Sequence, residues 1–416
     1  MKIGIISINA HTKVLNFASP LHSYAFQQFL TKKGYDNVII DYKPVYYGGM
    51  DVRHPYDHYL KHPDKNPEKQ EKLLAKWKYW YKEREGRFDK IQAFIDKYYV
   101  TTDKCYDHKL LDTEDPGCDI YICATDVIWK YNPKNGFDRG FFLDCKTMKG
   151  KGKIAYAASR GASTYNNDKK KKKFDTLVSD FDFVSTREKS LYEYINENTY
   201  AHANLVLDPV FLHDEDFYEP LYRKPEEEGY VLVYTVMNET PELVEEAYRF
   251  AQAKGLKLIE LSEDYQNAHI PEGTEHPVIY DLGVEEWLGY MKYADYIFTN
   301  SFHCCCFSII MHKEFFAGPR PGDKVDWVIE MFGLTDRRIK PGEEFAVQSI
   351  DFERIDAIRK KYQKASEHYI VKAIEKTKTR LKHPKLRKLS RRIGRGMKRR
   401  LNIEVRRGTD GIEKLI

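Results

Sequence analysis

KIGIISINAHTKVLNFASPLHSYAFQQFLTKKGYDNVIIDY, residues 2–42, contains the pattern that decides the fold. An apolar run at 2–8 predicts a buried strand, and segment 21–34 predicts an amphipathic helix that ends at a glycine. A second apolar run follows at 36–42. Two strands joined by a helix form a βαβ unit, which favours a parallel sheet. The loop after the first strand lacks the glycine-rich dinucleotide fingerprint, which argues against an NAD enzyme.

The same alternation continues along the chain and restarts after a charged, proline-containing linker, RKPEEEG, at 223–229. We therefore predict an α/β protein with two Rossmann-like domains that face a cleft. The domains are expected at residues 1–222 and 223–345, followed by C-terminal helices and a basic tail at 346–416. Ligands of doubly wound sheets bind at the carboxyl ends of the strands, so the site is expected there.

The chain has 416 residues and a net charge of only +5, but the positive charge is concentrated near the C-terminus. In segment 380–407, leucines and isoleucines recur among arginines, which favours a helix on an anionic membrane surface over a nucleic-acid-binding tail; a solvated disordered tail is the alternative. The pattern of residues 1–10 does not predict a signal peptide, and the scattered cysteines do not predict a disulfide framework. We expect a cytoplasmic protein, peripheral on the inner face of the membrane.

The segment TNSFHCCCFSII, residues 299–310, follows a predicted strand and begins a predicted helix. A helix N-terminus attracts anions, and a histidine there can donate a proton near neutral pH. We predict a catalytic role for His303 and substrate contacts for Asn300, Ser301 and Cys304; a histidine that only caps a turn is the alternative. Three adjacent thiols cannot converge on one metal ion, so we predict close packing of the helix and no metal.

Other strand ends supply further candidates. Arg187, in the segment FVSTREKS, can bind phosphate or carboxylate through two hydrogen bonds, or can form a surface ion pair. Asp126 can contact a sugar hydroxyl, act as a base or cap a helix. The loop and helix after the first strand place three more polar residues toward the same edge: Asn16, Ser19 and His22.

Over residues 1–340, the chain resembles the polysaccharide pyruvyl transferase family. The resemblance rests on short segments in a specific order, among them NFASPLHSYAFQ, DIYICATDVIW, FDFVSTREKS, VLDPVFL and ADYIFTNSFHCCCFSIIMHK. It implies a GT-B-like fold and transfer of the enolpyruvyl group of phosphoenolpyruvate to two sugar hydroxyls. The resemblance implies the essential histidine at His303 and the phosphate-binding arginine at Arg187. We predict a catalytic role for Asp126 as well, and substrate contacts for Thr125 and Trp129.

The chain also departs from that family pattern. Ser301 stands where some members have an arginine, and Ala124-Thr125 replaces glycine-serine before Asp126. The resemblance implies phosphoenolpyruvate as donor substrate, no cofactor, and a glycan acceptor; the basic tail favours a lipid-linked one, and galactose follows from the family alone. Two alternatives stay open, a nucleotide-sugar glycosyltransferase of the same shape and a relative that binds glycan without turnover.

Overall fold

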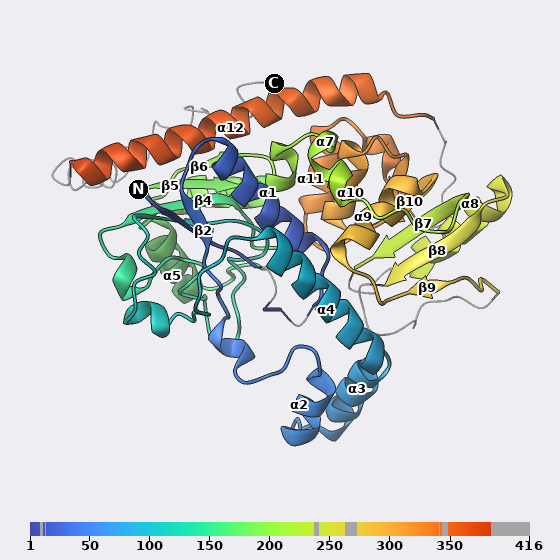
Figure 1. Ribbon diagram of the computed structural model, residues 1–416, viewed down its shortest axis with the longest axis horizontal. Coiled ribbons are helices and arrows are strands. Elements are labelled where there is room, and N and C mark those ends of the chain that lie inside the picture. The colour runs from blue at the N-terminus through green and yellow to red at the C-terminus, as the bar shows by residue number, and fades with distance from the viewer. Residues whose placement is uncertain are drawn as a thin grey trace.

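The computed structural model describes residues 1–8, 11–12, 14–236, 241–262, 273–340, 342 and 348–383. Two parallel sheets organise the described residues (Figure 1). The first has the order β2-β1-β3-β4-β5-β6. Its strands are β1 (Ile3–Ile6), β2 (Asn37–Ile39), β3 (Ile120–Cys123), β4 (Gly152–Ala158), β5 (Phe183–Thr186) and β6 (Ala203–Leu205). Helix α1 (Ala18–Lys32) joins β1 to β2, which pair in parallel, and this confirms the predicted βαβ opening.

The second sheet has the order β11-β10-β7-β8-β9. Its strands are β7 (Tyr230–Thr235), β8 (Lys257–Ser262), β9 (Val278–Ile279), β10 (Tyr296–Thr299) and β11 (Phe315–Ala317). Its helices are α8 (Pro241–Lys254), α9 (Val284–Tyr293), α10 (Phe302–Ile310) and α11 (Lys324–Met331). Each sheet is parallel and alternates with helices, so the prediction of two Rossmann-like α/β units is confirmed.

The first sheet carries further helices between its strands. They are α2 (Pro55–Lys61), α3 (Pro67–Lys78), α4 (Tyr81–Tyr98), α5 (Asp168–Val178) and α6 (Lys189–Asn198). Helix α7 (Glu215–Tyr218) follows the last strand of this sheet. Short 3-10 turns complete the connections: η1 (Val45–Tyr47), η2 (Leu110–Asp112), η3 (Lys146–Met148), η4 (Pro209–Leu212), η5 (Glu219–Leu221) and η6 (Thr335–Arg337). Helix α4 links the two units, because its buried Arg87 donates hydrogen bonds to the carbonyls of Leu15 at 2.9 Å and Ser262 at 2.6 Å.

The long helix α12 (Phe352–Lys382) begins after the second unit and crosses back over the first sheet (Figure 1). Ile370, Ala373 and Ile374 pack into the core on that face of the sheet. Gly152 permits this approach, because a Cβ there would lie 2.4 Å from the methyl group of Thr377. A helix is therefore present within the segment 346–416 where C-terminal helices were predicted, and it buries apolar surface of the first unit.

Within the described part of the chain, no helix combines the length and the apolar composition that a membrane span requires. The membrane contact predicted for 380–407 falls almost entirely on residues outside the described ranges, which end at 383.

Candidate active site

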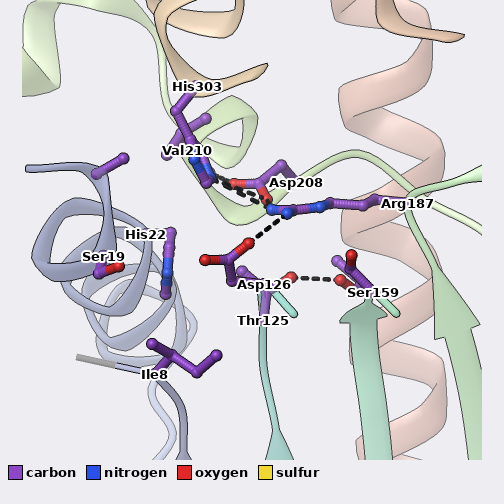
Figure 2. Close-up of polar contacts among 12 residues, drawn as sticks. Ile8, Ser19, His22, Thr125, Asp126, Ser159, Arg187, Asp208, Val210 and His303 are labelled. Atoms are coloured by element: carbon purple, nitrogen blue, oxygen red, sulfur yellow. Dashed lines mark hydrogen bonds and ion pairs between the residues drawn. The ribbon is translucent and has the colours of Figure 1, made fainter. Parts of the chain in front are cut away.

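Arg187 forms the centre of an ion-pair network at the carboxyl end of β5 (Figure 2). Its side chain is 1% exposed. Nη2 donates a hydrogen bond to Oδ1 of Asp126 at 2.7 Å, and Nη1 donates one to Oδ2 of Asp208. Nη1 also lies 3.2 Å from Nε2 of His303, which comes from the second unit. Three strand ends of the first sheet and one of the second therefore meet at a single guanidinium group.

The charges in this network stabilise one another. Burial alone would raise the pKa of the Asp126 and Asp208 carboxyls, but the Arg187 guanidinium lowers both pKa values well below their usual range. Burial would similarly lower the pKa of Arg187, and the two carboxylates raise it. All three groups are therefore ionised at neutral pH. Two carboxylates against one guanidinium leave a negative charge that a neighbouring cation or bound proton can offset.

His303 lies in the first turn of α10, directly after β10, and is 7% exposed. Its Nε2 is 3.6 Å from Oδ2 of Asp208. The two polar residues before it serve the fold. Asn300 accepts a hydrogen bond from the backbone N–H of Val236 at 2.7 Å, and Ser301 caps the helix by accepting one from Cys304 at 3.4 Å. The junction thus leaves His303 as the polar side chain that reaches the ion-pair network.

His22, on α1, faces His303 across the site (Figure 2), with ring centroids 5.6 Å apart. It is fully buried, and burial, together with the nearby His303, lowers its pKa to about 3. The imidazole is therefore neutral at physiological pH. Its Nδ1 lies 3.3 Å from the Ser23 hydroxyl, while Nε2 has no hydrogen-bond partner among the described residues. A buried, unpartnered ring nitrogen at this position is suited to bind a substrate atom.

Two groups near the network, Asp208 and Lys324, were not singled out from the sequence as site residues. Asp208 follows the short strand β6, in the turn that begins η4. Lys324, at the start of α11, is 8% exposed, and burial, followed by the charge of Arg320, lowers its pKa to about 8. The signal that could have found Asp208 and Lys324 is their position: each stands at the start of a helical segment that faces the strand ends.

Not all predicted substrate contacts lie at this network. Ser19 is one helical turn from His22 and is drawn beside it in Figure 2. Asn16 instead caps α1, and its Oδ1 accepts a hydrogen bond from Ala18 at 2.8 Å. The Thr125 hydroxyl donates to the carbonyl of Ala157. Trp129 is fully buried among aromatic rings, and its indole N–H donates to the carbonyl of Phe141 at 3.3 Å, so it forms part of the core.

The cysteine triplet is packed as the sequence predicted, because Cys304, Cys305 and Cys306 are all fully buried. The pKa of Cys304 indicates whether its thiol is reactive. Burial raises the pKa of Cys304 to about 12, although the residue lies at a helix N-terminus. Desolvation outweighs the helix dipole, so this thiol is not activated as a nucleophile.

A family model described as polysaccharide pyruvyl transferase matches residues 21–317. That range contains Asp126, Arg187, Asp208 and His303. Among curated proteins, no match is found.

Several solved structures are similar in chain course. They include a putative UDP-N-acetylglucosamine 2-epimerase from Listeria monocytogenes, with 10% identity, coverage of 90% of this chain and 95% of that one, and a TM-score of 0.48. The Rickettsia bellii UDP-N-acetylglucosamine 2-epimerase has 8% identity, coverage of 92% and 98%, and a TM-score of 0.47. The Methanocaldococcus jannaschii UDP-GlcNAc 2-epimerase has 14% identity, coverage of 90% and 99%, and a TM-score of 0.43. Similarities this low carry no information about substrate.

Proposed function

The chain belongs to the polysaccharide pyruvyl transferase family, and we propose that it transfers the enolpyruvyl group of phosphoenolpyruvate to two hydroxyls of a hexose. The products are a pyruvate ketal and phosphate. A galactose in a surface glycan, polymeric or linked to lipid, is the acceptor we favour. The observation that carries the proposal is the network of Asp126, Arg187, Asp208 and His303, which unites a proton-donating group with fixed charges at the strand ends.

His303 is the proposed proton donor. In its protonated form it delivers a proton to the methylene carbon of phosphoenolpyruvate, and the first sugar hydroxyl bonds to the adjacent carbon. The hydroxyl proton passes to a carboxylate, for which Asp126 is the candidate because its side chain is 20% exposed while that of Asp208 is fully buried. Loss of phosphate then leaves a cationic carbon. The second hydroxyl attacks this carbon, and its proton leaves with the phosphate.

Arg187 has a positioning role in this proposal. Both of its terminal nitrogens already pair with carboxylates, and its Nε, unpartnered in the described part of the chain, is buried, so a phosphate has little direct access to the guanidinium. Lys324 is better placed to attract the donor, since it is buried and has no hydrogen-bond partner among the described residues. It lies close enough to Asp126 for their charges to interact. In this proposal, Lys324 provides the positive charge that an arginine provides in some relatives, because this chain has Ser301 in place of that arginine.

The direct test is acceptor-dependent phosphate release from phosphoenolpyruvate, with a panel of aryl and lipid-linked galactosides. We expect His303→Ala to lower kcat by about 10²–10⁴-fold, the usual contribution of a general acid. His368→Ala, on the exposed face of α12, is the matched control and should retain full activity. Release that survives in His303→Ala would contradict the assignment of the proton donor.

A second outcome would remove the proposal as a whole. If no acceptor elicits phosphate release, and a nucleotide sugar raises the Tm while phosphoenolpyruvate does not, the chain acts as a glycosyltransferase. If a galactoside binds but neither donor does, the chain is a glycan-binding relative without turnover.

A further inference from the structure

A second cluster of chemically active side chains lies on the first sheet, at the edge formed by β2. His11 comes from the segment after β1, Asp41 follows β2, and Cys105 lies in the connection between α4 and β3. One ligand atom from each residue lies within 4.8 Å of the other two. His11 and Asp41 are 30 positions apart in sequence, and Asp41 and Cys105 are 64 apart, so the three residues do not form a local sequence motif.

The contacts converge on one nitrogen atom. Nε2 of His11 lies 2.5 Å from Oδ1 of Asp41 and 3.7 Å from Sγ of Cys105. In a catalytic relay, the carboxylate and the thiol would occupy opposite ring nitrogens, because one orients the histidine and the other loses its proton to it. Here both partners approach the same nitrogen. That geometry is a set of donor atoms gathered around a point, and it does not form a relay.

The thiol is also not an activated nucleophile. Burial, and then the charge of Asp41, raises the pKa of Cys105 to about 12. A reactive cysteine requires the opposite shift. A metal ion, by contrast, displaces the thiol proton when it binds.

The separations fit a tetrahedral site. With metal–sulfur and metal–nitrogen bonds of about 2.3 and 2.05 Å, a tetrahedral angle places the two ligand atoms about 3.6 Å apart. The observed separation between Sγ of Cys105 and Nε2 of His11 is 3.7 Å. The Asp41 oxygen needs to withdraw by less than about 1 Å from the histidine, a movement that its partly exposed side chain permits.

We propose that His11, Asp41 and Cys105 bind a single divalent transition-metal ion of the zinc type. One imidazole, one carboxylate and one thiolate form the mixed nitrogen, oxygen and sulfur set that Zn²⁺ accepts. Three protein ligands leave a fourth position for water or another ligand. A cavity of about 460 Å³ adjoins the site, and its lining includes His11, Lys43, Asp51 and Arg53. This proposal does not depend on pyruvyl transfer.

The test is a titration of the full chain with Co²⁺ under anaerobic, reducing conditions, followed by absorption spectroscopy. We expect a near-ultraviolet thiolate-to-cobalt band that saturates at one ion per chain and disappears when Zn²⁺ displaces the cobalt. Cys105→Ser should abolish the band, and His11→Gln should weaken binding at least tenfold. Cys145→Ser is the matched control, because Cys145 is a buried thiol outside the cluster, and it should leave the band unchanged.

The design also separates the cluster from a simpler metal site. His58 lies on α2 and His62 caps the C-terminus of that helix, with ring centroids 4.8 Å apart, and a histidine pair of this kind can bind Co²⁺ without any thiolate band. The variant with both His58→Gln and His62→Gln should keep the band. No band at saturating Co²⁺, or a band that persists in Cys105→Ser, would overturn the proposal.

Discussion

Two strand-to-helix junctions, one in each unit, both place polar side chains directly after a strand. The side chains have different roles at the two junctions. At the β5–α6 junction, Arg187 is tied to two carboxylates and Glu188 accepts a hydrogen bond from Ser159. At the β10–α10 junction, Asn300 and Ser301 hold the backbone, and His303 is left to face the site. The first junction is therefore electrostatic scaffolding, while the second presents a reactive group on a structural frame. Position at a strand end identifies the site but does not say which side chain is left for chemistry.

Replacement of Arg187 should produce the largest effect, because the arginine belongs to both scaffold and site. Arg187→Met leaves the fully buried Asp208 carboxylate and the nearby Asp126 carboxylate without their cation. Removing one partner of a buried ion pair costs about 3–5 kcal/mol of unfolding free energy, which urea denaturation would measure. His303→Ala should lower the unfolding free energy by less than about 1 kcal/mol while it lowers kcat by about 10²–10⁴-fold. Equal losses of stability in the two variants would end the distinction between the junctions.

A rescue variant tests the cause of that loss. If unpaired carboxylates destabilise Arg187→Met, addition of Asp208→Asn should restore part of the unfolding free energy. Additive losses in the double variant would instead indicate that packing against the Phe302 ring, 4.4 Å from the guanidinium, is the main contribution of Arg187.

Lys324 offers a further test of which groups serve the fold and which serve chemistry. We expect it to favour donor binding and to lower the free energy of unfolding. Burial lowers its pKa from 10.5 to about 8 in the folded chain, so below pH 8 folding must keep a charge in a buried position. The unfolded chain binds more protons between these values, and the stability of the wild type therefore rises as pH increases through this window. At neutral pH, the free energy of unfolding of Lys324→Met should exceed that of the wild type by on the order of 1 kcal/mol. This difference should vanish near pH 10.5.

Lys324→Met should also weaken the binding of phosphoenolpyruvate, the donor substrate. Without the ammonium group, we expect KM for phosphoenolpyruvate to rise about tenfold, with a smaller change in kcat. In the wild type, this KM should rise above pH 8 as the amine loses its proton. Lys324→Arg is the matched control, since it retains charge and should remove the alkaline rise. A KM that is insensitive to both substitutions would place the donor phosphate elsewhere.

The sequence predicted the sheets well and the site only in part. Long apolar runs such as 230–236 identify strands reliably, whereas β9 and β11 are two and three residues long and give too little pattern to detect. Trp129 was predicted to contact substrate, but an aromatic residue beside a motif is equally suited to the core, where the structure places it. Asp208 was not predicted as a site residue, because only the folded chain brings it to Arg187.

Substitution of His22, on the helix that follows β1, should have the smallest effect of these changes. His22→Phe removes the unpartnered Nε2, so stability at neutral pH should change by less than about 1 kcal/mol, while kcat/KM should fall about tenfold if one substrate hydrogen bond is lost. The folded pKa of about 3 lies below the ordinary 6.5, so the wild type loses stability as pH falls through this window, and the variant should lose less. Ser23→Ala removes the partner of Nδ1, together with a hydrogen bond from Ser23 to Ser7, but leaves Nε2 in place, and is the control. If both variants lower activity equally, the orientation of the ring matters and Nε2 does not bind substrate; if only His22→Phe does, the site extends onto α1.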